Sequence, residues 1–61
     1  MDDIEINLGF VKMPVGYKLM KEAYDGLYYW VNEHSEGSKS WDKWWVYRSA
    51  KMHSEERRRQ A

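Results

Sequence analysis

The sequence contains no cysteine, and it has one proline in 61 residues. Without cysteine, neither a disulfide nor a thiolate zinc site can stabilise the fold. Chains of about 60 residues often need such cross-links, because they bury only about 60% of the surface that the unfolded chain exposes. We therefore expect a single small domain (residues 1–61, frayed at 1–3 and 60–61) that is marginally stable alone and works as a homodimer or in a complex.

Long hydrophobic runs are absent as well. The longest apolar or aromatic run, residues 27–31, is far shorter than the roughly 20 residues of a membrane-spanning helix. The acidic start, MDDIE, lacks the basic head of a signal peptide. Together with the lack of cysteine, which fits a reducing compartment, these features predict a cytoplasmic protein that does not bind membranes.

Net charge is also zero, because ten basic side chains balance ten acidic ones. The balance hides a division along the chain. The side chains of residues 1–36 sum to −4, and those of residues 37–61 sum to +4. This asymmetry predicts a dipolar molecule whose two halves attract each other.

The hydrophobic pattern begins with an alternation over the first ten residues. Four apolar side chains there are separated by single residues: Ile4, Ile6, Leu8 and Phe10. A period of two is typical of a strand with one buried face. Pro14 and Gly16 follow, and we expect a turn or an edge segment at 11–16, because proline has no amide hydrogen and glycine admits unusual φ values.

Residues 17–33 admit two interpretations. Apolar residues recur there at spacings of three and four, as they do on one side of a helix. Asp25-Gly26, however, is a type I′ hairpin signal, and the aromatic run LYYWV favours a strand. We favour a hairpin with strands near 17–24 and 27–32, and a mostly α-helical fold with a helical hairpin is the alternative.

A long helix is predicted from Trp41 onwards, after a polar loop in which Ser38 or Ser40 provides the cap. At 100° per residue, one stripe of this helix contains Trp41, Trp45, Arg48 and Met52, with Trp44 at its border. Another side contains Val46, Ala50 and, more loosely, Tyr47. We predict that Trp45 belongs to the core. A short strand at 44–47 is the alternative, given its β-propensity.

The predicted fold class is therefore α+β, with a short N-terminal strand and a β-hairpin packed on one long C-terminal helix. The order MPVGY, an Asp-Gly turn, LYYWV, a short loop and a tryptophan-rich helix resembles the layout of small bacteriophage or prophage accessory proteins. The resemblance spans residues 13–53. It implies a protein that binds and modulates or inhibits a host protein, in the host cytoplasm if the chain is phage-encoded. It rests on layout, so no functional residue carries over from it.

The sequence offers little for catalysis. His34 in the polar loop and His53 late in the helix match no metal-ligand spacing. The order His53-Ser54-Glu55 does not make a triad, because adjacent side chains on a helix point 100° apart. We therefore expect no enzyme, no metal or other cofactor, and no small-molecule substrate.

The C-terminal helix is the best candidate for a function. Tryptophan, tyrosine and arginine are enriched at interface hot spots, and a small hairpin can cover only one of the two apolar sides of this helix. We predict that the uncovered strip binds another protein, either a host protein or a second copy, through Trp44, Tyr47, Arg48 and Lys51. Three further cations would steer the encounter or aid solubility: Arg57, Arg58 and Arg59. A helix wedged between the hairpin and the N-terminal strand would instead leave no side uncovered.

A nucleic-acid-binding module is the alternative function, because these cations lie beside flat aromatic surfaces. Against it, Glu55 and Glu56 interrupt the basic tract, and the isoelectric point of 6.7 is low for such a protein. Phosphate contacts weaken steeply with salt and an aromatic interface does not, so salt dependence separates the two functions.

Overall fold

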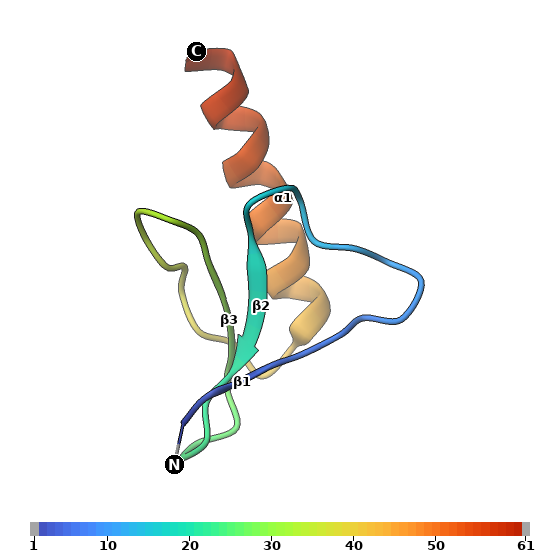
Figure 1. Cartoon of the computed structure of the whole chain (residues 1–61), viewed down its shortest axis with the longest axis vertical. Helices are drawn as coiled ribbons and strands as arrows, with labels where there is room; N and C mark the ends of the chain where they lie inside the picture. The colour runs from blue at the N-terminus through green and yellow to red at the C-terminus, as the bar shows by residue number, and fades with distance from the viewer. Residues whose placement is uncertain (1, 61) are drawn as a thin grey trace.

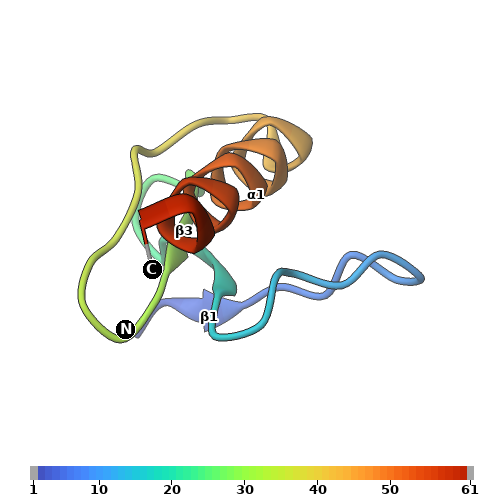
Figure 2. The same cartoon turned by 90° about the horizontal axis from the view of Figure 1, so that it is seen from above.

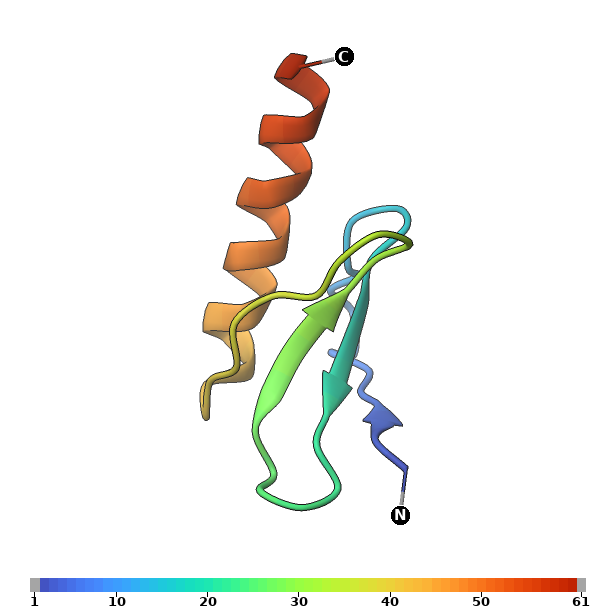
Figure 3. The ribbon, with the colours of Figure 1, turned by 90° about the vertical axis from the view of Figure 1, so that its left-hand side faces the viewer.

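The fold is a three-stranded antiparallel sheet packed against one helix, in a computed structural model that describes residues 2–60. The order along the chain is β1 (Ile4–Glu5), β2 (Lys18–Lys21), β3 (Tyr28–Val31) and α1 (Lys43–Gln60). Figures 1 and 3 show α1 running alongside the hairpin of β2 and β3, with its last turns beyond the end of the sheet. The predicted α+β class is confirmed, and neither the helical hairpin nor the strand at 44–47 forms. The expected fraying of Met1 and Ala61 concerns residues outside the described range.

β2 and β3 form the predicted hairpin, but the predicted turn is wrong. A type I′ turn requires positive φ at both Asp25 and Gly26, and in the described residues only glycines have positive φ, with 74° at Gly26. The amide of Glu22 donates to the carbonyl of Leu27 (2.8 Å), and the amide of Gly26 donates to the carbonyl of Glu22 (3.1 Å). Four residues, 23–26, therefore connect the strands instead of two.

The N-terminal segment forms a shorter strand than its alternation predicts. β1 pairs Ile4 with Lys21 and Glu5 with Met20 and then ends, and Ile4 is 56% exposed. Only Ile6 and Leu8 pack against the core, so the predicted buried face is limited to these two side chains. The chain then leaves the sheet, and Phe10 is fully exposed.

Of the turn or edge segment predicted at 11–16, the structure has a turn at its end. The amide of Tyr17 donates to the carbonyl of Pro14 (3.0 Å). Gly16 has a φ of 86°, which a residue with a Cβ would adopt only with strain. The turn returns the chain to the sheet at the start of β2.

The polar loop after β3 protects the outer edge of that strand. The Asn32 side chain accepts hydrogen bonds from two following amides and so helps to reverse the chain. The returning segment then pairs with β3: the amide of Gly37 donates to the carbonyl of Trp30 (2.8 Å), and Tyr28 and Ser40 exchange two backbone bonds (2.7 and 2.9 Å). Covering an edge in this way satisfies backbone groups that would otherwise pair with another chain.

α1 begins at Lys43 and not at Trp41, because Asp42 provides the cap. The Asp42 carboxylate accepts a hydrogen bond from the amide of Trp44 (2.9 Å). The hydroxyl of Ser40, one of the two predicted caps, accepts one from the amide of Asp42 (3.1 Å) and so holds the capping residue itself. An aspartate here pairs a free helix amide and places negative charge at the positive end of the helix dipole.

The core lies between the sheet and one narrow side of α1. Its buried members are Tyr17, Leu19, Trp30, Val46 and Ala50. Leu19 and Trp30 are partners across β2 and β3, while Val46 and Ala50 are four residues apart on α1 and fully buried. Two small side chains allow the helix backbone to approach the sheet closely and fill the space at protein density.

The predicted core stripe of the helix is therefore wrong. Trp45 is 43% exposed, Met52 is 65% exposed, and Trp41, which precedes α1, is 73% exposed. The stripe lies on the far side of the helix from Val46 and Ala50 because the sheet accepts the small residues and excludes the large ones.

Candidate protein interface

The four predicted interface residues lie at or near the surface of α1. Trp44 is 43% exposed, Arg48 and Lys51 are exposed, and Tyr47 is half-buried. The rings of Trp44 and Tyr47 make an edge-to-face contact, with centroids 6.3 Å apart and planes at 84°, an arrangement that favours aromatic pairs. We call these four residues the outer strip. Their common feature is that they lie away from the buried side of the helix.

A shallow groove of about 200 Å³ runs along one flank of the outer strip. Tyr47 and Lys51 line it from α1, and Lys12 and Pro14 line it from the segment before β2. Glu55 adds a carboxylate to the same wall. This flank therefore combines an aromatic ring with charges of both signs, as the polar rim of an interface does.

A larger groove of about 410 Å³ lies on the other flank of the helix. We call it the Trp45–Met52 groove; its lining residues are Trp30, Trp45, Arg48, Ser49, Met52, His53 and Glu56. Its walls are mainly apolar and its two charged side chains have opposite signs. This groove was not predicted from the sequence, because the hydrophobic pattern placed Trp45 and Met52 in the core.

Aromatic rings form the floor of the Trp45–Met52 groove. Trp30 and His53 have ring centroids 4.7 Å apart, and Tyr17 packs edge-on against Trp30 at 5.3 Å. Two hydrogen bonds hold these rings: Trp30 Nε1 donates to Ser49 Oγ (3.3 Å), and the Tyr17 hydroxyl lies 2.5 Å from His53 Nδ1. The groove is therefore pre-formed, with its base held by the core.

His53 thus has a structural position that was not predicted from the sequence. A signal for it exists in the sequence, because Val46, Ala50 and His53 are spaced four and three residues apart and so share one side of a helix. His34 lies exposed in the loop, with Nε2 3.9 Å from Glu33. Within residues 2–60, no three histidine, cysteine or carboxylate side chains gather closely enough to hold a metal ion.

The predicted steering residues lie in the last turns of α1. Arg57, Arg58 and Arg59 are all exposed. Figure 1 shows these turns extending past the ends of β2 and β3. They also sit at the negative end of the helix dipole, which basic side chains stabilise.

The shifted pKa values cluster elsewhere, on the face of the sheet opposite α1. The Tyr29 hydroxyl donates to the Asp3 carboxylate; this bond, with burial, raises the pKa of Tyr29 to about 12. The same bond, followed by one from the amide of Ala23, lowers the pKa of Asp3. Lys39 donates to Glu22, which raises the pKa of Lys39, and its Nζ lies 5.5 Å from the centre of the Tyr29 ring.

We call these paired side chains the clasp, since they tie the N-terminal segment and the loop after β3 to the sheet. Their hydrogen bonds join segments far apart in the chain. The clasp is thus a structural device. Asp3 belongs to the segment that was expected to fray, yet its carboxylate accepts two hydrogen bonds.

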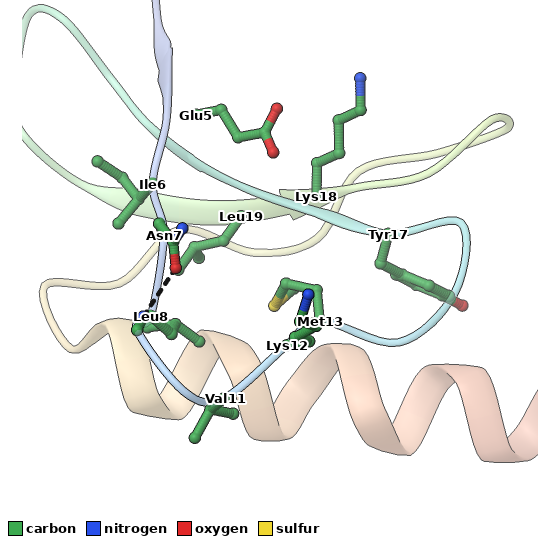
Figure 4. A pocket seen from close by; sticks show the side chains of 11 residues that line it. Glu5, Ile6, Asn7, Leu8, Val11, Lys12, Met13, Tyr17, Lys18 and Leu19 are labelled. Atoms are coloured by element: carbon green, nitrogen blue, oxygen red, sulfur yellow. Dashed lines mark hydrogen bonds between the residues drawn. The ribbon is translucent and has the colours of Figure 1, made fainter.

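A third hollow, of about 370 Å³, lies where the N-terminal segment leaves the sheet. Figure 4 shows Leu8, Met13 and Leu19 between β2 and α1, while Lys18 points away from the helix. Leu8 and Met13 are partly buried against the core. These contacts anchor the base of the loop that carries Phe10.

Comparison of the chain with protein-family models, curated proteins and solved structures gave no match. In residues 2–60 no helix is both long enough and apolar enough to cross a membrane. Function must therefore be inferred from the arrangement of the side chains.

Proposed function

We propose that this chain is a non-enzymatic protein-interaction module that binds another protein through the side of α1 that faces away from the sheet. One observation carries the proposal: two tryptophans and a methionine, Trp44, Trp45 and Met52, are 43%, 43% and 65% exposed on a helix that the sheet holds in place. Tryptophan is the residue type most enriched at binding hot spots, and a fixed helix loses little freedom on binding.

The dimensions of an ordinary interface support a site larger than the outer strip. A standard complex buries about 800 Å² on each partner, roughly a sixth of the 4880 Å² surface of this chain. A partner of that size would cover the outer strip and one of its flanking grooves. Aromatic side chains would then lie at the centre of the contact, and Arg48 and Lys51 would lie at its rim.

Two features bear on the identity of the partner. The resemblance to small bacteriophage accessory proteins favours a host protein, which this chain would modulate or inhibit in the cytoplasm. The marginal size of the core favours a second copy. In both cases Arg57, Arg58 and Arg59 would steer the encounter without contacting the centre of the interface.

A nucleic-acid-binding module is the second candidate function. It is favoured by the exposure of the basic side chains of α1 next to the ring of Trp44, because stacking and phosphate contacts need such a surface. It is opposed by Glu55 and Glu56, which are exposed between the two groups of cations.

Capture from a bacterial lysate, with and without nuclease, tests the proposal. The bait is the whole chain, compared with a double variant, Trp44→Ala with Tyr47→Ala. Tyr24→Ala is the matched control, because Tyr24 is 98% exposed in the β2–β3 turn, outside the interface. We expect the double variant to bind the captured protein about 30-fold more weakly or worse, the scale of a hot spot. Nuclease should not alter this result.

Two results would contradict the proposal. Equal capture by the double variant and by the Tyr24→Ala control would show that the outer strip is not the site. Capture that disappears after nuclease treatment, with a steep salt dependence and a loss on neutralising Arg57, Arg58 and Arg59 together, would establish the nucleic-acid function instead.

A further inference from the structure

A loop that projects from the body of the protein carries an exposed aromatic side chain that has no part in the core or in the outer strip. Figures 1 and 2 show the segment around residue 10 extending away from both the sheet and the helix. Phe10 stands at its tip, with its full side chain in solvent. We call residues 7–12 the finger.

The finger has a defined shape. Leu8 and Val11 form an antiparallel bridge, so Gly9 and Phe10 are the two central residues of a tight turn. Gly9 has a φ of 78°, and no other residue type in the described chain has positive φ, which is the pattern of a type II′ turn. The amide of Gly9 also donates to Asn7 Oδ1 (2.8 Å). Phe10 is therefore presented by a fixed turn and not by a slack loop.

The same molecule contains a receptacle for such a side chain. The Trp45–Met52 groove has a volume of about 410 Å³, and a cavity of about 150 Å³ suffices to bind a benzene ring. Its aromatic floor and its methionine wall suit a phenyl group, because edge-on ring packing and sulfur–aromatic contacts are both favourable.

The finger cannot be expected to reach the groove of its own chain. It follows β1, at one edge of the sheet, and Lys12 lies against the Tyr47 flank of α1. The groove lies on the other flank of α1, beside Trp30 of β3, the strand at the opposite edge. A finger and a groove that meet must therefore belong to two copies.

The charge distribution favours a second copy over an unrelated partner. α1 contains six basic and two acidic side chains, a sum of +4, whereas residues 2–42 contain eight acidic and four basic ones, a sum of −4. The finger belongs to the negative part of the chain, although its own one charged residue is Lys12, and α1 forms most of the groove. A head-to-tail contact therefore brings the negative part of one copy towards the positive helix of the next, and attraction between these parts favours their encounter.

We propose that Phe10 of one copy inserts into the Trp45–Met52 groove of a second copy. The contact is head-to-tail, because the finger and the groove are different surfaces on opposite flanks. Contacts of this type build rings or open chains and not a closed two-fold dimer. The inference rests on the proposed function, since it names the partner of one flank of the same helix.

Sedimentation of the purified chain from low to high micromolar concentration tests the contact. The variants are Phe10→Ala, which removes the finger tip, and Met52→Glu, which places a charge in the groove; both residues are exposed, so circular dichroism should confirm unchanged folds. Tyr24→Ala is the control for loss of an exposed aromatic side chain. We expect the wild type and the control to assemble beyond dimers, and each of the other variants alone to associate roughly 30-fold more weakly or worse.

Mixing the two variants is the decisive step. Phe10→Ala still has a groove and Met52→Glu still has a finger, so an equimolar mixture should form a dimer and nothing larger. A wild type that stays monomeric, a Phe10→Ala variant that assembles like the wild type, or a mixture that stays monomeric would each overturn the proposal.

The same variants separate this inference from the proposed function. Suppose that capture from the lysate depends on Trp44 and Tyr47 but not on Phe10, and that the wild type is monomeric. This result would support the proposed interaction module and contradict the finger contact. Loss of the captured protein in Phe10→Ala, with a monomeric wild type, would mean that the finger contacts another protein, which also overturns the inference.

Discussion

The two sides of α1 differ in the opposite sense from that expected of an amphipathic helix. The side that faces the sheet presents Val46 and Ala50, both fully buried, whereas the side that faces solvent presents Trp44, Trp45 and Met52. The small residues are inside and the large ones outside. This difference shows that in a small sheet–helix fold the bulk of a side chain does not decide whether it is buried.

The reason is that the sheet itself supplies the large side chains of the core. Leu19 of β2, Trp30 of β3 and Tyr17, which directly precedes β2, lie between the sheet and the helix and belong to the buried core. The helix must then contribute small side chains if the layers are to close without voids or overlaps. Trp44 and Trp45 have no place in that space, and remain available for a partner.

The largest expected effect comes from replacing a tryptophan in the core between the sheet and α1, and comparing it with a tryptophan on the solvent side of α1. Trp30→Ala removes a ring that is 5% exposed, and we expect a loss of about 3–5 kcal/mol in the free energy of unfolding, enough to unfold much of so small a domain. Trp45→Ala should cost less than half of that, about 1–2 kcal/mol, since nearly half of its surface is already in water. Urea unfolding followed by circular dichroism measures both. Equal losses would show that Trp45 belongs to the core after all.

The position of the Trp30 ring allows a finer test. Gly37 passes so close to it that a Cβ at this position would lie 2.1 Å from Trp30 Nε1, well inside van der Waals contact. The Trp30 ring cannot move away freely, because it packs against the His53 ring and donates a hydrogen bond to Ser49. Gly37→Ala should therefore cost about 1–3 kcal/mol by overpacking. Ser38→Ala, an exposed neighbour, should stay within about 0.5 kcal/mol in the same urea experiment. Matching effects would mean that the inner side tolerates displacement of the ring.

The order of the elements was predictable from the sequence. Alternation, the Asp-Gly turn signal and the apolar pattern after Trp41 predict strand, hairpin and helix, and the structure has that order. The details that failed depend on local choices between similar alternatives. Asp25-Gly26 is a type I′ turn signal, but of these two residues only Gly26 adopts positive φ. Serine and aspartate cap helices about equally well, and here Asp42 accepts the bond from the helix amide while Ser40 accepts a bond from Asp42.

The side of the helix that faces the sheet was not predictable in the same way. Hydrophobicity favoured Trp41, Trp45 and Met52, whereas the distance between the layers, a property of the whole fold, selected Val46 and Ala50. The residues of the outer strip do lie together on α1, and the rings of Trp44 and Tyr47 touch. Its companion groove was missed as a direct result of the error about the core.

The smallest expected effect concerns the face of the sheet opposite α1. The clasp on that face depends on the protonation state of its side chains, and the core between the sheet and α1 does not. Tyr29 keeps its proton to about pH 12 in the folded chain and to about pH 10 when unfolded. A raised pKa means that its contribution to stability is complete below about pH 10 and is lost as the pH rises through 12. The pKa of Asp3 is lowered, so its contribution is present above about pH 4 and is lost as the pH falls further.

Thermal unfolding of the wild type and of Tyr29→Phe across the pH range measures this contribution. We expect the wild type to have the higher melting temperature, by a margin that is constant from about pH 5 to 9 and that shrinks above pH 10 and below pH 4. Asp3→Asn should also move one step of the alkaline phenolate absorbance to lower pH, because it removes the carboxylate that holds the Tyr29 proton. The control at an exposed position, Tyr24→Phe, should have the same melting temperature as the wild type at every pH. A margin that ignores pH would show that the clasp stabilises by packing alone, and that the two faces of the sheet are held in the same way.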